Sequence, residues 1–181
     1  MKKILLSALM LVALSSVSLA QRTLITAGEQ YVGGKIALGS IGGASMGFIG
    51  NYEYGYQDNI GIGGAIAYSG YSEDISAGFY TGKWSYSNIL VVVSGNYHMD
   101  LLKNEKLDTW GALNVGYNVA SVKWEFTKNT LNLPEPAAAS AGGFVFGLTA
   151  NARYQLTEKL FATGSLGFGL GVLNIGLDYK L

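Results

Sequence analysis

The strongest constraint on the fold is a two-residue alternation of bulky apolar side chains with small or polar ones. Between Ile60 and Ser69, isoleucine and tyrosine alternate with glycine, alanine and serine, and the same kind of pattern returns between Leu173 and Leu181. Successive side chains of a β-strand point to opposite faces, so this period is typical of strands. Repeated along the chain, it predicts eight strands, at residues 31–40, 44–57, 60–71, 84–99, 109–126, 143–156, 160–168 and 171–181.

Composition indicates which face of these strands meets water. Only 13% of the residues are charged, and the chain contains 26 glycines. A soluble barrel such as a lipocalin needs a charged exterior around an apolar interior, whereas a membrane barrel carries its apolar belt outside. So few charges cannot cover a soluble barrel. We therefore predict an all-β fold, a single antiparallel up-and-down transmembrane β-barrel of about eight strands, following a cleaved signal peptide.

The connections predict the orientation of this barrel, because outer-membrane barrels have short periplasmic turns and longer extracellular loops. Every second connection is short, at residues 57–59, 101–108 and 157–159. Segments 72–83 and 127–142 are predicted to be extracellular loops. The tight connections at 40–43 and 169–171 depart from the pattern, although they belong to the same end. An even number of strands places both termini in the periplasm.

The first residues have the layout of a signal peptide for export. Lys2 and Lys3 precede an apolar run from Ile4 to Leu14, and Ala20 precedes the expected cleavage point. The run is shorter than the roughly 20 residues of a membrane-spanning helix. The chain therefore divides into a signal peptide over 1–20, a short N-terminal periplasmic segment over 21–30 and an outer-membrane barrel over 31–181. It has no cysteine.

Some charged residues fall on the predicted inner face of the strands. They include Lys35, Glu53, Arg153 and Asp178. Charges removed from water need partners of opposite sign. We therefore predict that these residues form an ion-pair network in the lumen, near the periplasmic side, that plugs the barrel. For Asp178, together with Lys180, contact with water at the periplasmic rim is an equally good interpretation.

Aromatic residues gather near both ends of the predicted strands. Tyrosine and tryptophan favour the level of the lipid headgroups, where the ring lies in an apolar region and the polar tip reaches water. A general enrichment of aromatic residues in strands explains their number less well than their placement. The predicted girdles consist of Tyr54, Tyr97, Tyr154 and Tyr179 at the periplasmic end, and of Tyr68, Trp84 and Trp124 at the outer end.

Three stretches of the chain resemble a known family. Tyr52 to Tyr68, Gly95 to Asn118 and Asn151 to the C-terminus each follow a pattern of strand, turn and strand, with a tyrosine before the turn. They are similar to the small porin-like outer-membrane β-barrel proteins, such as OmpX and the barrel of OmpA. The resemblance implies insertion by the barrel-assembly machinery and contact with outer-membrane lipid and lipopolysaccharide. Many members end in an aromatic residue, whereas this chain ends in Leu181.

Residues suited to catalysis are scarce. Barrel enzymes that act on lipids or peptides use a histidine beside a serine or a carboxylate near the outer rim. The single histidine, His98, precedes a predicted periplasmic turn, which favours a structural role. The acidic pair Glu73 and Asp74 has too few further ligands nearby for calcium. We expect no enzyme activity, no cofactor and no metal, and the net charge of zero gives no indication of a nucleic-acid partner.

The sequence is compatible with functions of different classes. The first is a structural or surface-interaction protein, acting in adhesion or envelope integrity, with loops 72–83 and 127–142 contacting a host or cell-surface ligand. The second is a narrow porin-like channel for small solutes, which would need a water path between the small inner side chains. A lipid-modifying enzyme is a remote alternative. The first is favoured because an eight-stranded barrel is filled by its own side chains.

Overall fold

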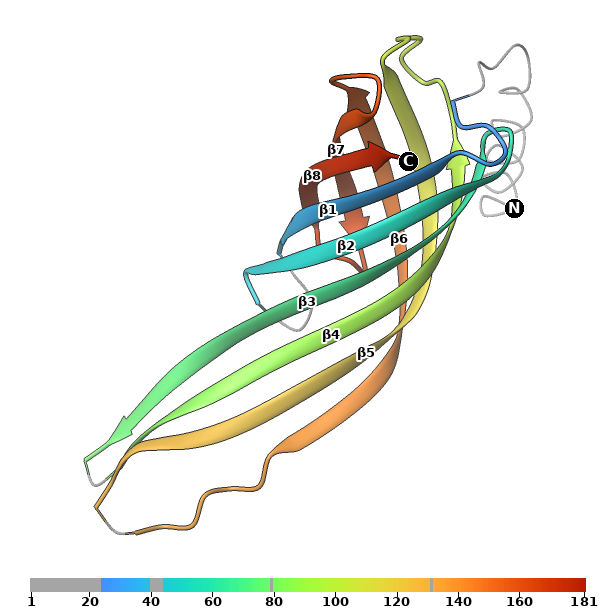
Figure 1. Ribbon diagram of the computed structural model, residues 1–181. Helices are drawn as coiled ribbons and strands as arrows, with labels where there is room; N and C mark the ends of the chain where they lie inside the picture. Colours follow the sequence, from blue (N-terminus) through green and yellow to red (C-terminus); the bar gives the residue numbers. More distant parts are fainter. Residues whose placement is uncertain (1–23, 40–43, 79, 131) are drawn as a thin grey trace, which may run out of the picture.

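The computed structural model describes residues 24–39, 44–78, 80–130 and 132–181. These residues form an antiparallel barrel in which each strand pairs with the next strand along the chain (Figure 1). The barrel closes where β1 pairs with β8. The strands are β1 Gln30–Leu38, β2 Met46–Gln57, β3 Ile60–Ala77, β4 Tyr80–His98, β5 Leu107–Asn129, β6 Ala139–Gln155, β7 Leu160–Phe168 and β8 Leu173–Lys180. The predicted fold class is therefore confirmed. The predicted signal peptide over 1–20 lies outside the described residues.

No helix among the described residues is long and apolar enough to cross a membrane.

The register of the strands sets the tilt of the barrel. Starting from Ala37 and following paired residues through β2, β3, β4 and β5 leads to Ala141 on β6. The opposite route, through β8 and β7, leads to Asn151. The ring thus closes with a stagger of ten residues on β6, which requires strongly tilted strands. Eight tilted strands leave an interior just wide enough for side chains to fill.

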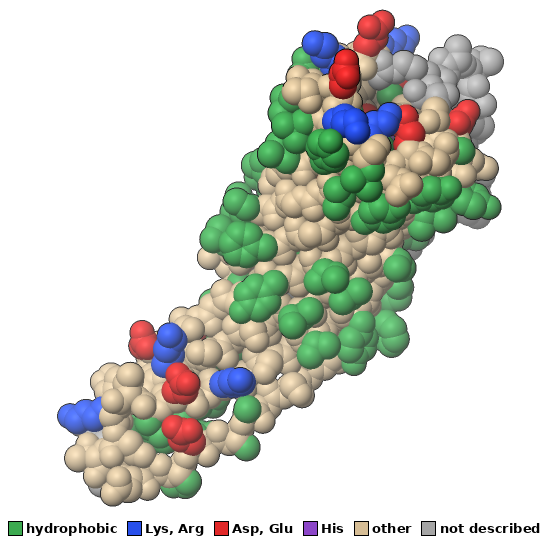
Figure 2. Space-filling model, in the orientation of Figure 1, with side chains coloured by type: hydrophobic (Ala, Val, Ile, Leu, Met, Phe, Trp, Pro, Cys, Tyr) green, Lys and Arg blue, Asp and Glu red, His purple; other side chains and the backbone are tan. Residues whose placement is uncertain are grey.

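The alternation places the bulky face outside. Val91 is 51% exposed and Leu148 is 54% exposed, whereas Asn114 on the other face is buried. Figure 2 shows apolar side chains around the middle of the molecule and charged side chains gathered toward its two ends. A surface of this kind suits hydrocarbon and not water. The predicted facing of the strands is therefore confirmed within this apolar belt.

Four strands are longer at one end than the sequence predicts. The predicted loop 72–83 is mostly the end of β3 and the start of β4, and the predicted loop 127–142 shrinks to residues 130–138 between β5 and β6. The prediction of long loops is wrong because the polar residues in these segments continue the strand alternation. β3, β4 and β5 consequently extend far beyond β1 and β2, toward the lower left of Figure 1. We call this the raised end, and the opposite end the short-turn end.

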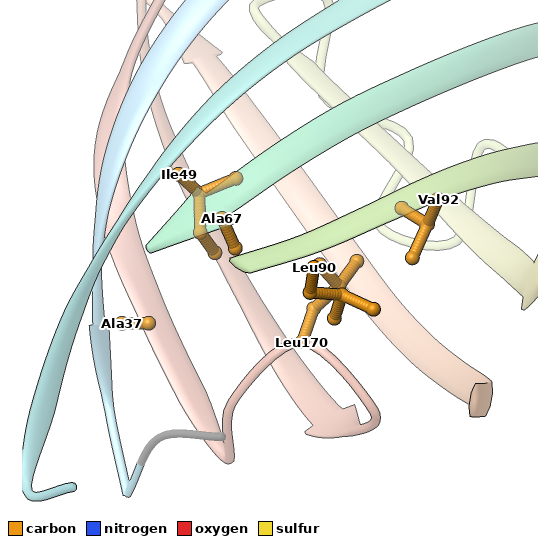
Figure 3. Close-up of a cluster of buried hydrophobic side chains, with 6 residues drawn as sticks. All are labelled: Ala37, Ile49, Ala67, Leu90, Val92 and Leu170. Atoms are coloured by element: carbon orange, nitrogen blue, oxygen red, sulfur yellow. The ribbon is translucent and has the colours of Figure 1, made fainter. Parts of the chain in front are cut away.

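Two apolar clusters fill the lumen at different levels. The apolar plug, nearer the raised end, consists of Ala37, Ile49, Ala67, Leu90, Val92 and Leu170 (Figure 3). At the short-turn end, Ile25 packs with Tyr31 and Phe161. Ile25 precedes β1 and is fully buried, and its carbonyl accepts a hydrogen bond from the Asn59 amide at 2.9 Å. From residue 24 onward, the predicted periplasmic segment is therefore folded into the mouth of the barrel.

Candidate functional site: a sealed lumen and a raised sheet

Four polar side chains close a ring inside the barrel near the short-turn end. We call Glu53, His98, Asp108 and Arg153 the charge ring. Arg153 Nη1 donates to Glu53 Oε2 at 2.8 Å, and its Nη2 lies 2.7 Å from Asp108 Oδ2. His98 Nδ1 lies 2.8 Å from Asp108 Oδ1, and its Nε2 lies 3.0 Å from Glu53 Oε1. Arg153 is 1% exposed and His98 is 0% exposed, so the ring is removed from bulk water.

The geometry of His98 bears on the charge of this ring. Each of its two nitrogens faces a carboxylate oxygen. A neutral imidazole donates from one nitrogen only, whereas an imidazolium donates from both. An imidazolium also balances the charges, since the guanidinium and imidazolium then match the two carboxylates. Pairing of every charge is the condition under which a buried ionic group is tolerated.

Aromatic rings hold the charge ring in place. The Arg153 guanidinium lies 3.6 Å from the ring centroid of Tyr31 and 5.0 Å from that of Trp110. The His98 ring stacks on Trp110 with centroids 5.2 Å apart. A guanidinium over an aromatic face gains electrostatic stabilisation, which increases when water is excluded. The ring and its aromatic wall therefore form a second plug below the apolar plug.

The predicted network residues have different surroundings. Glu53 and Arg153 are brought together, as described. Asp178 is 2% exposed and accepts a hydrogen bond from Asn51 Nδ2 at 3.0 Å, so the alternative of a water-exposed rim is wrong for this residue. Lys35 lines the same lumen cavity as Glu53 and Asp178, but no carboxylate of the described residues lies within 4 Å of its ammonium.

The rim of the short-turn end carries a separate pair. Lys180 Nζ lies 2.5 Å from Glu29 Oε1, and both side chains are partly exposed. Burial acts to raise the pKa of Glu29, but the hydrogen bond and the charge of Lys180 lower it below its ordinary value. The rim interpretation therefore fits Lys180, which does not join the charge ring.

Sequence reasoning missed two members of the charge ring. Asp108 was expected in a turn over residues 101–108, whereas β5 already begins at Leu107. The sequence contains a signal that Asp108 faces inward, because it alternates in phase with Trp110, Ala112 and Asn114, which are all buried. His98 was expected at the periplasmic rim and instead lies fully inside. Its contacts come from β2 and β5, and no local pattern reveals them.

A small polar cavity separates the two plugs. It measures about 60 Å³ and is lined by side chains such as Asn51, Asn174 and Ser165. A single water needs roughly 10–15 Å³ of such space, so the cavity has room for only a few waters. Above it lies the apolar plug, and below it the charge ring. The lumen is therefore blocked at two levels.

The raised end has the opposite distribution of polarity from the barrel. We call residues 70–77, 80–87 and 121–129 the raised sheet. Going up its outer face, the rows of paired residues are Tyr68–Ile89–Val119, Gly70–Ser87–Ser121, Ser72–Ser85–Lys123 and Asp74–Lys83–Glu125. The change from apolar to polar occurs at the row of Gly70. A lipid-facing surface therefore ends at this row, and a water-facing surface begins.

The inner face of the raised sheet is aromatic where the lumen below is largely small or polar. Its rows are Tyr71–Tyr86–Val122, Glu73–Trp84–Trp124 and Ile75–Gly82–Phe126. Tyr71 and Tyr86 stack with centroids 4.6 Å apart, and Trp84 and Trp124 lie 4.9 Å apart. The Trp124 ring lies over Gly82, where a Cβ atom would come within 2.0 Å of it. This packing stabilises strands that lack a barrel around them.

The exchange of polarity corrects the predicted outer girdle. Tyr54, Tyr68, Tyr97, Tyr154 and Tyr179 are all well exposed on the outer face. Trp124 is 7% exposed and, with Trp84, lies on the inner face of the raised sheet, so the girdle prediction is wrong for these two. On the outer face of β5 and β6, Tyr117 and Phe144 are exposed and pack against each other with ring centroids 5.4 Å apart.

The closed strand order, the apolar outer belt and the filled polar lumen define the class of the protein: it has the fold of the small outer-membrane β-barrels. Among solved structures, the N-terminal β-barrel domain of Pseudomonas aeruginosa OprF is similar, with a TM-score of 0.57 and 11% identity over 86% of this chain and 98% of that one. A de novo designed transmembrane β-barrel gives a TM-score of 0.51 and 14% identity over 87% of this chain and 98% of that one.

Ail, the attachment invasion locus protein of Yersinia pestis, gives a TM-score of 0.47 and 15% identity over 86% of this chain and 100% of that chain. The sequence matches no protein-family model and no curated protein. At identities this low, the similarities show the fold alone.

Proposed function

We propose that the protein is a surface-interaction protein of the outer membrane, in which a sealed barrel anchors the raised sheet outside the cell. The observation that carries this proposal is the exchange of polarity above the row of Gly70. Strands that continue beyond the lipid with a polar outer face are suited to contact with water. The short turns then face the periplasm, and the raised sheet is extracellular.

The shape of the rim supports an interaction surface and not merely a taller barrel. β1, β2, β7 and β8 end below the raised sheet, so its inner face is not enclosed by strands on the opposite side (Figure 1). The pairing of β3 with β2 ends at Ser69, and beyond it no strand of the described residues lies along this edge of β3. A partner therefore has access to an aromatic face and a strand edge that the barrel itself does not need for closure.

The proposed location also defines the other partners. The apolar belt contacts outer-membrane lipid and lipopolysaccharide, and the barrel-assembly machinery inserts the chain. The contact with a cell-surface or host ligand comes from the raised sheet and residues 132–138, in place of the longer loops that the sequence predicts. We propose no catalytic role for His98, because both of its nitrogens are engaged within the charge ring.

Shortening the β3–β4 hairpin tests the interaction role. Residues 72–85 are replaced by a two-residue Asn-Gly turn that joins the paired residues Tyr71 and Tyr86. We expect the shortened protein to fold and insert, since every strand residue of the lipid-facing belt is kept. Bacteria displaying it should lose adhesion to a cultured epithelial monolayer but carry the same amount of heat-modifiable barrel in the outer membrane as bacteria displaying the full-length protein. Unchanged adhesion would contradict the proposed function.

Conductance tests the alternative of a narrow channel. Refolded protein in a planar bilayer is expected to show no steady openings, because the apolar plug and the charge ring both block the lumen. A larger barrel porin incorporated in the same bilayer set-up serves as the positive control. Steady ohmic openings that scale with the salt concentration would favour the channel over the sealed anchor.

A further inference from the structure

The inner face of the raised sheet carries one kind of charge. On the rows from Tyr71 to Ile75, Glu73 is the charged residue, and it is exposed. The nearby lysines lie on the other face. In the strand register, Lys83 lies opposite Asp74 and Glu125. This row is on the outer face, like the row in which the hydroxyls of Ser72 and Ser85 lie 3.4 Å apart. A bulge at Thr81 and Gly82 pairs Lys128 with Thr81, which keeps this lysine on the outer face as well.

The aromatic residues around Glu73 divide into two groups. Trp124 is buried beneath its neighbours and holds the sheet together. Tyr71, Trp84 and Tyr86 remain partly exposed on the same face. Internal packing accounts for Trp124, but it leaves part of the other three rings uncovered. These rings lie beside the Glu73 carboxylate, which no cationic group of the described residues approaches within 4 Å.

Exposed aromatic faces beside a carboxylate favour one ligand chemistry. The negative face of an aromatic ring attracts cations, and a neighbouring carboxylate adds a full opposite charge. Among biological cations, a guanidinium both stacks on aromatic rings and pairs with a carboxylate through two parallel hydrogen bonds. No cation of the described residues of the raised sheet lies on this face, so the site is open to a guanidinium brought by a partner.

The spacing of the rows favours an extended partner. Neighbouring rows on one face are two residues apart along the strands, or roughly 6.6–7 Å. Alternate side chains of an extended peptide repeat at the same distance. If the arginine of such a peptide lies at the row of Glu73 and Trp84, the peptide residues two positions before and after it lie over the rows of Tyr71 and Ile75.

We propose that the inner face of the raised sheet binds an extended segment of a partner protein through an arginine, whose guanidinium lies over the exposed aromatic rings and pairs with Glu73. This proposal rests on the proposed surface-interaction function and specifies the partner's chemistry. The arginine-bearing segment approaches over the low rim formed by β1, β2, β7 and β8, where the raised sheet is open.

The test uses the full chain refolded in an uncharged glycoside detergent, because a choline headgroup would itself compete for aromatic rings. The probe is an end-blocked pentapeptide, Thr-Val-Arg-Val-Thr, and its match carries citrulline, which is neutral and has nearly the same shape. Binding is followed by NMR of the tryptophan indole N–H groups, with lumen-facing Trp110 as the internal reference. The arginine peptide should shift Trp84 and bind about five-fold more tightly than the citrulline peptide.

Two variants at adjacent positions give the matched control. Glu73→Gln should weaken the arginine peptide by about five-fold, to the level of the citrulline peptide. Asp74→Asn removes the same charge from the outer face and should leave the affinity within about two-fold. Both side chains are exposed, so both variants should fold, as checked by heat-modifiable mobility in electrophoresis.

Equal effects of the two variants would overturn the proposal, because they would indicate unspecific attraction to an acidic patch. Equal binding of the arginine and citrulline peptides would overturn it too. Neither result would affect the proposed function, which stands or falls with adhesion of the shortened protein. Conversely, if the adhesion test contradicted the proposed function, the peptide measurement would still report independently on binding at the inner face.

Discussion

Arg153→Met is expected to lower the free energy of unfolding by about 3–5 kcal/mol, the cost of removing one partner from a buried ion pair. The guanidinium contacts both Glu53 and Asp108, and it is almost fully buried. Without it, Glu53 and Asp108 lose their guanidinium partner in a site that water barely reaches, and His98 is the one remaining member of the charge ring that can carry a positive charge. Urea titrations of the protein refolded in lipid vesicles measure the loss.

A matched rim variant and a double variant sharpen this result. Lys180→Met removes a cation from the partly exposed pair with Glu29 and should cost no more than about 1 kcal/mol. Adding Glu53→Gln to Arg153→Met removes the uncompensated charge and should recover part of the loss, so the two changes should not be additive. A cost below about 1 kcal/mol for Arg153→Met would contradict the interpretation of Arg153 as a buried and fully paired charge.

Val91→Arg should lower the free energy of unfolding by about 2–4 kcal/mol, as expected for a cation near the middle of the lipid-facing surface. Val91 is half exposed on the outer face of β4, within the apolar belt. Ser85→Arg is the control on the same strand and the same face. Ser85 lies above the row of Gly70, so its arginine reaches water and should cost about 0–1 kcal/mol.

The comparison of these two positions tests the polarity boundary directly. Similar costs at Val91 and Ser85 would mean that the lipid extends over the raised sheet, and the raised sheet would then not be a water-exposed surface. A larger cost at Ser85 than at Val91 would contradict the assignment of the apolar belt itself. The same urea titrations in vesicles provide both numbers.

The raised sheet shows why the sequence was misread at one end. Ser72, Asp74 and Ser76 alternate with Tyr71, Glu73 and Ile75, which is a strand pattern. The polar phase, however, has moved from the inner face to the outer face. The prediction assumes that the apolar face points outward along the whole of each strand, and this assumption fails above the row of Gly70. The predicted strands therefore end too early, and Trp84 and Trp124 are placed in the lipid.

The charge ring illustrates a different limit. Alternation along each strand is enough to place Glu53 and Arg153 on the inner face, although they lie 100 residues apart in sequence. It does not indicate which inner residues meet across the lumen. Lys35 has the same facing but no carboxylate of the described residues within 4 Å, whereas Asp108 and His98 complete the ring.

By itself, the sequence determined the strand count, the closed antiparallel class and the direction of each face within the apolar belt, because the alternation of a strand is a local property of consecutive residues. The tertiary structure alone decided the charge ring, the double block of the lumen and the aromatic inner face of the raised sheet. Those features depend on the stagger at which β1 meets β8, which sets the height of every residue relative to all others.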